Sequence, residues 1–262
     1  MKLDLTGKTA LVCGASQGIG AATARELAAL GARVVLLARS PGPLAETLTT
    51  LAGGSARGHR SIAVDLGDVS AVESAATQLL ADVGPVEILV ANAGGPPGGA
   101  MVDAQRDQFL AALGPHLFAP SALVRLLVPG MRERGYGRIV NVISTSVKAP
   151  IPGLGVSNTV RAAVANWAKT LSMELGPLGI TVNSVLPGYT RTGRLSGLLE
   201  ATSKRTGKAV QAIEAEWREH VPARRFAEPE EIASVVAFLA TPAAGYVNGV
   251  AIAVDGGRTP SL

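Results

Sequence analysis

Short runs of β-branched and aliphatic residues alternate with helix-length segments along all 262 residues of the chain. Each run has the length of a buried strand, and the segment after it is long enough to return across a sheet as a helix. Parallel strands need such crossovers, so the alternation predicts a parallel sheet covered by helices on both faces. The predicted strands are 9–13, 33–38, 61–64, 86–91, 138–143, 180–185 and 250–254.

Predicted helices fill the segments between the strands. The last one begins at Pro229, followed by Glu230 and Glu231, and a proline with acidic residues suits a helix N-terminus. We therefore predict the α/β class, as a single doubly wound Rossmann-type domain over residues 1–262 with a seven-stranded parallel sheet. The predicted helices are 17–30, 42–53, 70–83, 103–133 (expected to be broken), 157–176, 207–220 and 229–240.

The composition fits one compact domain. Hydrophobic residues make up 47% of the chain and charged residues 17%, which argues against disorder. No apolar run approaches the ~18 residues of a membrane span, and the N-terminus lacks the apolar core of a signal peptide. The lone Cys13 lies in an apolar run, where we expect a buried, inert thiol in a reducing compartment. A cytoplasmic protein without membrane contact is therefore expected.

The formal net charge of +4 comes mostly from arginines scattered along the sequence. There is no basic tail and no interleaving of basic with aromatic residues, so nucleic acid is not an expected partner. A bias toward anionic small molecules is the more modest expectation. The three histidines, His59, His116 and His220, lack metal-ligand spacing, and we expect no metal.

A glycine-rich turn follows the first predicted strand, in the stretch C-G-A-S-Q-G-I-G. Gly14, Gly18 and Gly20 have the spacing G-x-x-x-G-x-G at the entrance to a helix. Glycines at such a turn let the backbone approach a pyrophosphate, whose charge is met by the amides and dipole of the helix N-terminus. A tight strand-to-helix turn without a ligand is the alternative interpretation.

Further motifs follow the later strands in order along the chain. They are Asp65, the tetrad A-N-A-G, Ser144, the segment P-G-Y-T-R-T at 187–192 and V-D-G-G at 254–257. Together with the glycine turn, this set resembles the short-chain dehydrogenase/reductase family over the whole chain, and its 3-oxoacyl-carrier-protein reductases in particular. The resemblance implies a nicotinamide dinucleotide held where the strands end, with a small-molecule substrate beside it.

The resemblance also assigns cofactor contacts to particular residues. The pyrophosphate and the adjacent ribose would lie against the glycine turn, the adenine against Asp65 and Leu66, and the nicotinamide against the P-G-Y-T-R-T segment. The implied cofactor-binding residues are Gly14, Ser16, Gln17, Gly18, Ile19, Gly20, Arg39, Ser40, Asp65, Leu66, Asn92, Ala93, Gly94, Arg161, Pro187, Gly188, Thr190 and Thr192.

The second predicted strand ends in L-L-A-R-S, which places Arg39 where an acidic residue would bind a free ribose 2′-hydroxyl. A guanidinium pairs instead with a 2′-phosphate. The predicted cofactor is therefore NADP(H) rather than NAD(H). The alternative is a surface arginine at the end of a strand.

The residues that would carry proton transfer depart from the family pattern. Members of this family normally have a serine, a tyrosine thirteen residues later and a lysine four residues beyond it, with an asparagine in the long fourth helix. The same count from Ser144 reaches Ser157 and Arg161, and R-A-A-V continues in the phase of the usual Lys-Ala-Ala. The asparagine position is occupied by His116.

These replacements change the chemistry at each position. A serine hydroxyl is far less acidic than a phenol, so Ser157 is expected to position a water or a substrate oxygen. Arg161 cannot relay a proton, but its planar fork suits ribose hydroxyls or a developing alkoxide; a salt bridge at the pocket edge is the alternative. His116 is the candidate proton donor, or else a packed helix residue. Ser144 would bind the substrate oxygen, or else only backbone.

Residues 191–225 correspond to a mobile substrate lid in relatives. Val210, Ile213, Trp217 and Val221 recur at helical spacing and predict an apolar face toward the core. The basic residues of the segment would attract an anionic or acyl-carrier-linked substrate, unless they form only a solvated loop. Tyr189 would reach the substrate or pack over the cofactor.

Two functions are consistent with these observations. The first is an NADP(H)-dependent oxidoreductase that transfers a hydride to a carbonyl or related C=X group with a non-standard proton donor. The second is a catalytically weak or inactive NADP(H)-binding sensor or scaffold. We favour the enzyme because the nicotinamide-side motifs and Ser144 are retained. By resemblance, we also expect a homo-oligomer, a tetramer or dimer, with the helices at 103–133 and 157–176 in the interface.

Overall fold

The computed structural model describes residues 1–261, and its centre is a seven-stranded sheet in which every pairing is parallel. The strand order is β3-β2-β1-β4-β5-β6-β7, so the predicted fold class is confirmed. The strands are β1 (Thr9–Cys13), β2 (Arg33–Ala38), β3 (Arg60–Ala63), β4 (Ile88–Ala91), β5 (Gly137–Val142), β6 (Ile180–Pro187) and β7 (Ala251–Val254).

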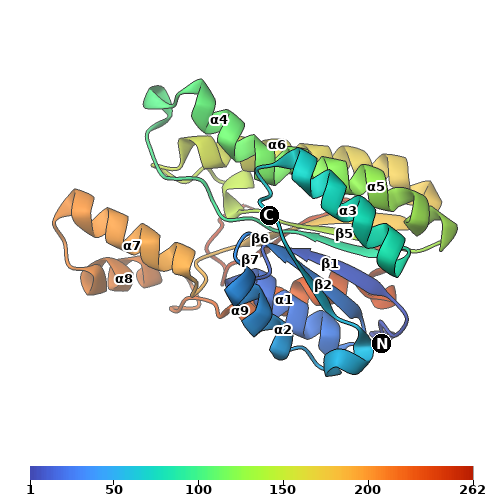
Figure 1. Ribbon diagram of the computed structural model, residues 1–262. Helices are drawn as coiled ribbons and strands as arrows, with labels where there is room; N and C mark the ends of the chain where they lie inside the picture. Colours follow the sequence, from blue (N-terminus) through green and yellow to red (C-terminus); the bar gives the residue numbers. More distant parts are fainter. Residues whose placement is uncertain (262) are drawn as a thin grey trace.

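Helices cover both faces of the sheet (Figure 1). One layer holds α1 (Gly18–Ala29), α2 (Pro41–Thr49) and α9 (Pro229–Leu239), with α1 packed on α9. The other layer holds α3 (Val69–Val83), α4 (Arg106–Leu113), α5 (Ala119–Glu133) and α6 (Gly155–Leu175), with α3 packed on α5. Short 3₁₀ turns lie at Gly54–Arg57, Met101–Asp103, Thr145–Val147, Gly176–Leu178 and Pro242–Ala244.

Side-chain alternation along each strand divides the core between the two layers. Ala10 and Val12 of β1 join the cluster beneath α1 and α9, whereas Leu11 and Cys13 join the cluster beneath α3, α5 and α6. All four are buried, as expected for a central strand covered on both faces. Burial raises the pKa of the Cys13 thiol to about 12, so this cysteine stays protonated and inert.

The direction of chain crossover reverses between β1 and β4, which are hydrogen-bonded neighbours. In doubly wound sheets, the loops on either side of such a reversal diverge at the carboxyl ends of the strands and leave a crevice. The loops after β1 and β4, which carry the glycine turn and Asn92, therefore flank this crevice.

The segment Arg106–Glu133 forms a continuous helical run of 28 residues. A π-helical turn at Gly114–Phe118 joins α4 to α5. The predicted break is therefore a local change from α-helical to π-helical hydrogen bonding, and the helix is not interrupted by a loop. By length and a mean hydropathy of 1.4 the run could cross a membrane, contrary to the expectation that no segment approaches that length. Half of its most apolar window is nevertheless buried inside the fold, as in the core helix of a folded domain.

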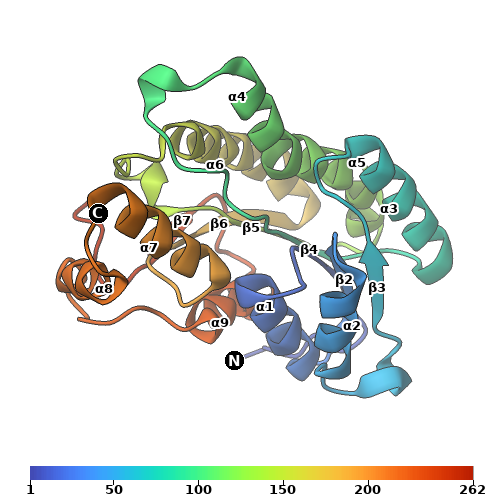
Figure 2. The same ribbon diagram turned by 60° about the vertical axis from the view of Figure 1, so that its left-hand side comes forward.

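A pair of helices, α7 (Gly193–Thr206) and α8 (Val210–Glu219), lies beside the two layers (Figure 1, Figure 2). Sequence reasoning predicted a helix over α8 and missed α7. The apolar face of α8 does not join the main core as expected. Instead, Val210, Ile213 and Trp217 pack with Leu195 and Leu199 of α7 in a separate small cluster.

Candidate functional site

A cavity of about 1570 Å³ opens at the carboxyl ends of the strands, where the sheet topology predicts a ligand. Its wall contains most of the predicted catalytic and cofactor-binding residues. Of those residues, only Gly20 and His116 do not line it. The lining includes Gly14, Ser16, Gln17, Gly18, Ile19, Arg39, Ser40, Asp65, Leu66, Asn92, Ala93, Gly94, Ser144, Ser157, Arg161, Pro187, Gly188, Thr190 and Thr192.

The glycine turn is built so that only glycine fits. Gly14 and Gly18 have φ angles of 61° and 54°, in the left-handed region that side chains disfavour. A Cβ on Gly20 would lie 2.1 Å from the carbonyl oxygen of Gly14. The turn therefore brings bare backbone to the N-terminus of α1, where the first amides of the helix are free to bind a phosphate.

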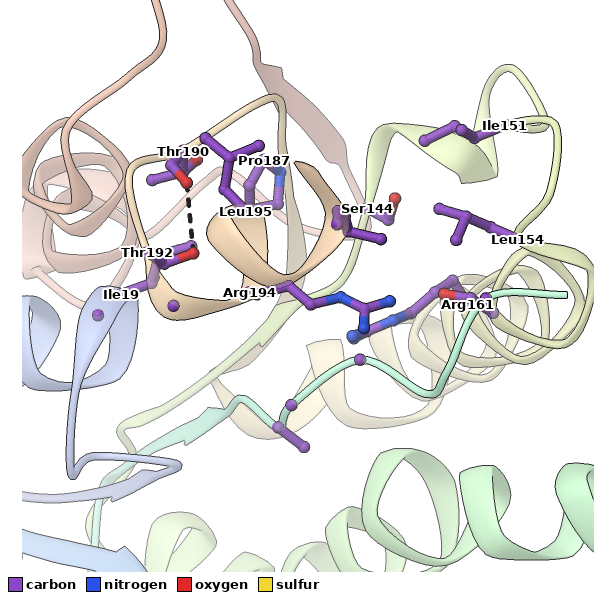
Figure 3. A pocket seen from close by; sticks show the side chains of 18 of the residues that line it. Ile19, Ser144, Ile151, Leu154, Arg161, Pro187, Thr190, Thr192, Arg194 and Leu195 are labelled. Atoms are coloured by element: carbon purple, nitrogen blue, oxygen red, sulfur yellow. Dashed lines mark hydrogen bonds between the residues drawn. The ribbon is translucent and has the colours of Figure 1, made fainter. Parts of the chain in front are cut away.

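Asn92 connects the two sides of the crevice. Its Nδ2 donates to the carbonyl oxygens of Cys13 and Gly14, each at 3.3 Å, so the end of β4 is held against the end of β1. Across the crevice, the Thr192 side chain would be 3.1 Å from a Cβ on Gly18. Thr192 itself donates to the Thr190 carbonyl at 3.3 Å (Figure 3). The crevice is therefore narrow beside the glycine turn.

Arg39 lies at the end of β2 with 76% of its side chain exposed. Its only ion pair within residues 1–261 is with Asp65, at 3.8 Å. Such a long, exposed contact contributes little stability and leaves most of the guanidinium donors available. The geometry therefore suits an added phosphate on the adenosine ribose, as the sequence predicts.

Ser144, Ser157 and Arg161 meet in one wall of the cavity. The Ser144 hydroxyl oxygen accepts from the Ser146 amide at 3.1 Å, which is the backbone bond that was the alternative to a substrate contact. The two roles are compatible, because the hydroxyl proton of Ser144 stays free to be donated. Ser157 is 7% exposed and comes from the first turn of α6, below Arg161.

Arg161 is an unusual cation because it is 6% exposed and has no acidic partner in the part of the chain that the structure describes. Its Nη1 donates to the Val142 carbonyl at 3.1 Å, and its buried Nε has no hydrogen-bond partner. Burial, and then the charge of Arg194, lower the pKa of Arg161 to about 10. The guanidinium thus remains protonated at neutral pH, and the alternative of a salt bridge at the pocket edge is not seen among residues 1–261.

His116 lies in the π-helical turn, is 5% exposed, and leaves its Nε2 without a partner among the described residues. Burial and then the charge of Arg161 lower the pKa of His116 to about 3, although a hydrogen bond with the Gly94 backbone opposes this shift. A neutral imidazole is therefore expected at physiological pH. This packed position argues against the hypothesis that His116 donates the proton.

Tyr189 packs against side chains of the protein, a contact that the sequence did not predict. Its ring stacks on Trp217 with centroids 5.0 Å apart and meets Phe226 edge-on at 5.5 Å. The guanidinium of Arg258 lies 4.3 Å above the same ring. Tyr189 thereby fastens the α7–α8 pair to the end of β6.

Sequence reasoning gave little weight to several residues of the cavity wall. Arg194, one of the basic residues in the predicted lid at 191–225, extends from α7 across the crevice and donates to the Pro96 carbonyl at 2.7 Å. Ile151 and Leu154 form an apolar edge near Ser144 (Figure 3). No local pattern marks these positions, because they meet only through the fold. Within residues 1–261, no group of three or more His, Cys, Asp or Glu side chains is arranged to hold a metal.

The geometry can be compared with proteins of known sequence and structure. A family model described as enoyl-(acyl carrier protein) reductase matches residues 14–259. The short-chain reductase protein NovJ of Streptomyces niveus is 34% identical, over 95% of this chain and 93% of that protein. The 3-oxoacyl-acyl-carrier-protein reductase FabG of Vibrio cholerae is 33% identical, over 97% of this chain and 98% of that protein. The L-sorbose reductase of Gluconobacter frateurii, solved with NADPH and L-sorbose, has a TM-score of 0.92 at 33% identity, with 100% of both chains covered.

Proposed function

Because the chain belongs to the short-chain dehydrogenase/reductase family, we propose that it is an NADP(H)-dependent oxidoreductase that reduces a carbonyl or related C=X group without the usual tyrosine. The observation that carries this proposal is the position of Ser144 and Arg161 in the same cavity as an intact glycine turn. When bound, NADPH supplies the hydride. The protein supplies orientation, charge and a path for the proton.

The residues present fit the cofactor. Only glycine fits at Gly14 and Gly20, where a Cβ would lie within 2.9 Å of Asn92 or the Gly14 carbonyl, so the turn presents bare backbone to the pyrophosphate. The exposed Arg39 matches a 2′-phosphate. The L-sorbose reductase that this fold resembles was solved with NADPH, which supports the same choice of cofactor.

The carbonyl oxygen of the substrate would be bound by Ser144 and stabilised by Arg161. As the carbonyl carbon gains the hydride, the π-electron pair moves to oxygen, and a nearby buried guanidinium stabilises the developing negative charge. That oxygen then takes a proton from water positioned by Ser144 and Ser157. Loss of a strong general acid costs ~10²- to 10⁴-fold in rate, so activated C=C and iminium bonds, which need less acid assistance, are also suitable substrates.

A spectrophotometric screen of NADPH oxidation tests the proposal. The intact protein is mixed with NADPH and with ketones, β-ketoesters, enones or cyclic imines. At least one class should oxidise NADPH above the background rate. If NADPH binds tightly in a calorimetric titration while every class stays at background, the protein is a nucleotide-binding sensor or scaffold instead.

We also propose that the protein forms a dimer or tetramer through α5 and α6. A shallow apolar groove of about 310 Å³ runs between these two helices, with Val124, Val128, Trp167 and Leu171 among its lining residues. A second copy of the same helix pair would cover these side chains. Sedimentation at low micromolar concentration tests the proposal, and a mass near 26.6 kDa, that of one chain, would contradict it.

A further inference from the structure

Two guanidinium groups, those of Arg161 and Arg194, point toward one another across the crevice (Figure 3). Arg161 comes from α6, in a helical layer that covers the sheet, and Arg194 comes from the first turn of α7. Like charges brought together in a partly buried place destabilise each other. The fold nevertheless holds both side chains there, which is the arrangement of a site for a group of opposite charge.

Most of the hydrogen-bond donors of this pair have no protein partner. A guanidinium carries five N–H donors. Arg161 uses one on the Val142 carbonyl, and Arg194 uses one on the Pro96 carbonyl. The Nε of Arg161 is buried and unpaired. Two planar forks with free donors match the oxygens of a carboxylate.

No acid in the cavity wall neutralises the pair. The only Asp and Glu side chains that line the cavity are Asp65 and Glu216. Asp65 lies 3.8 Å from Arg39, and Glu216 is bound to Lys208 at 2.9 Å. Neither Arg161 nor Arg194 forms an ion pair within the described residues. Among the described residues, no acid therefore faces the pair, and an anionic ligand would supply the negative charge.

The phosphates of the cofactor do not fill this role. The glycine turn follows β1 and Arg39 ends β2, so the pyrophosphate and the 2′-phosphate belong on that side of the crevice. The arginine pair lies on the other side, near Ser144, Ile151 and Leu154 (Figure 3). An anion placed between the two guanidinium groups is thus on the substrate side.

We propose that the substrate is a small oxo acid whose carboxylate binds between Arg161 and Arg194, with its carbonyl oxygen at Ser144. Its carbon skeleton would lie against the apolar edge formed by Ile151 and Leu154. This inference rests on the proposed function, since it names the substrate class of the same site. The pKa values agree with the geometry: burial chiefly lowers those of both arginines, and the charge of Arg194 lowers that of Arg161 further, so a bound anion would reverse part of this shift.

The bound carboxylate would also hold α7 closed. Arg194 is already tied to the loop after β4 through the Pro96 carbonyl. A carboxylate bound by both Arg194 and Arg161 would add a second contact between α7 and the helical layer that contains α6. Substrate binding and closure of the α7–α8 pair would then be coupled.

Matched substrates test the inference. The oxo acids 3-oxobutanoate and 4-oxopentanoate are compared with their methyl esters as oxidants of NADPH. Charge-assisted hydrogen bonds favour the acid, so its kcat/KM should exceed that of the ester by about 10- to 100-fold. Equal rates for acid and ester, or faster ester reduction, would overturn the inference and leave the oxidoreductase assignment intact.

Variants locate the effect. Arg194→Gln should raise KM for the acid by about 10- to 100-fold, change kcat little and leave the ester unaffected, and Arg194→Lys should restore part of the loss. Lys204→Gln removes a charge from the same helix at an exposed position outside the cavity wall, and it should behave as wild type. An acid preference that survives in Arg194→Gln contradicts the inference.

A binding measurement keeps the inference independent of turnover. Calorimetry of the NADP⁺ complex with 4-oxopentanoate should show heat that the methyl ester and the Arg194→Gln variant lack. If the acid binds in this way but no carbonyl compound is reduced, the proposed function fails and the carboxylate site stands. If neither acid nor ester binds, the inference is wrong.

Discussion

The cofactor side of the crevice is shaped by backbone atoms, and the substrate side is shaped by side chains. On the cofactor side, Gly14, Gly18 and Gly20 shape the site with backbone, and an added Cβ would contact neighbouring atoms. On the substrate side, Arg161 and Arg194 shape it with long charged side chains whose donors are mostly free. The first side is complete without a ligand, whereas the second lacks a counter-charge. The comparison teaches that a family's cofactor site can persist while the chemistry beside it is replaced.

The cofactor side is the less tolerant of the two. Gly20→Ala places a Cβ 2.1 Å from the Gly14 carbonyl oxygen, so the turn must move. We expect loss of measurable NADPH binding and a drop of about 1–3 kcal/mol in the free energy of unfolding. Fluorescence titration and denaturant unfolding measure the two effects. Gly42→Ala in α2 is the matched control, since nothing lies within 4 Å of that Cβ, and normal NADPH binding by Gly20→Ala would break the comparison.

A substitution on the substrate side should lower turnover strongly and change stability little. In Arg161→Met we expect kcat to fall by about 10²- to 10³-fold, because the charge that stabilises the developing alkoxide is removed. The free energy of unfolding should not fall, since the wild-type guanidinium is buried without a counter-ion. Steady-state kinetics and denaturant unfolding test both parts, with Arg161→Lys as the charge-retaining control. A variant that keeps wild-type kcat would remove Arg161 from the reaction.

Arg39 should control only the choice between the two dinucleotides. Arg39→Gln is expected to raise the Kd of NADPH by about 10- to 100-fold through loss of a charge-assisted contact, with little change for NADH. Titration with both dinucleotides measures the ratio. Arg60→Gln, which disrupts the pair with Asp82 outside the cavity wall, should leave both affinities unchanged. Equal weakening for NADH would show that Arg39 does not bind the 2′-phosphate.

His116 should affect stability and leave turnover unchanged. Its pKa is about 6.5 in the unfolded chain and about 3 in the folded one, so the unfolded state binds more protons between these values. Stability is therefore lost as the pH falls below about 6.5, and this histidine should account for a loss of about 2 kcal/mol between pH 7 and pH 5. Denaturant unfolding at both pH values should show a smaller loss in His116→Gln.

The pH profile of kcat provides the complementary test at the same position. With a neutral, packed imidazole, His116→Gln should have the profile of the wild type. A profile that shifts in the variant would return His116 to the role of proton donor and would undo the argument from burial.

Most of the sheet could be predicted from sequence because strands β1, β2, β4, β5 and β6 are largely buried on both faces. Such strands appear in the sequence as mostly apolar runs, and every predicted run lies within two residues of an observed strand. Helix α7 was missed because Gly193 and Gly197 weaken its helical signal and its hydrophobic residues are few. The spacing of Leu195 and Leu199 was the one available sign of that helix.

The parts of the site that follow from spacing along the chain could be predicted. The parts that depend on how the helices pack against one another could not. Family spacing placed Ser144, Ser157 and Arg161, and these three line one wall of the cavity. Spacing gave no indication that Arg194 approaches Arg161, because that contact depends on how α7 is placed against α6. It also gave no indication that His116 lies behind the wall, because the π-helical turn rotates it out of regular helical phase.

The separate hydrophobic cluster of the α7–α8 pair has a consequence for how new specificities can arise. Leu195, Leu199 and Ile213 hold the two helices together without help from the strands, and Tyr189 anchors them at one end. The two helices therefore pack on each other and not on the main core of the sheet. Substitutions on the cavity side of the pair can alter specificity while the core beneath the sheet keeps its packing.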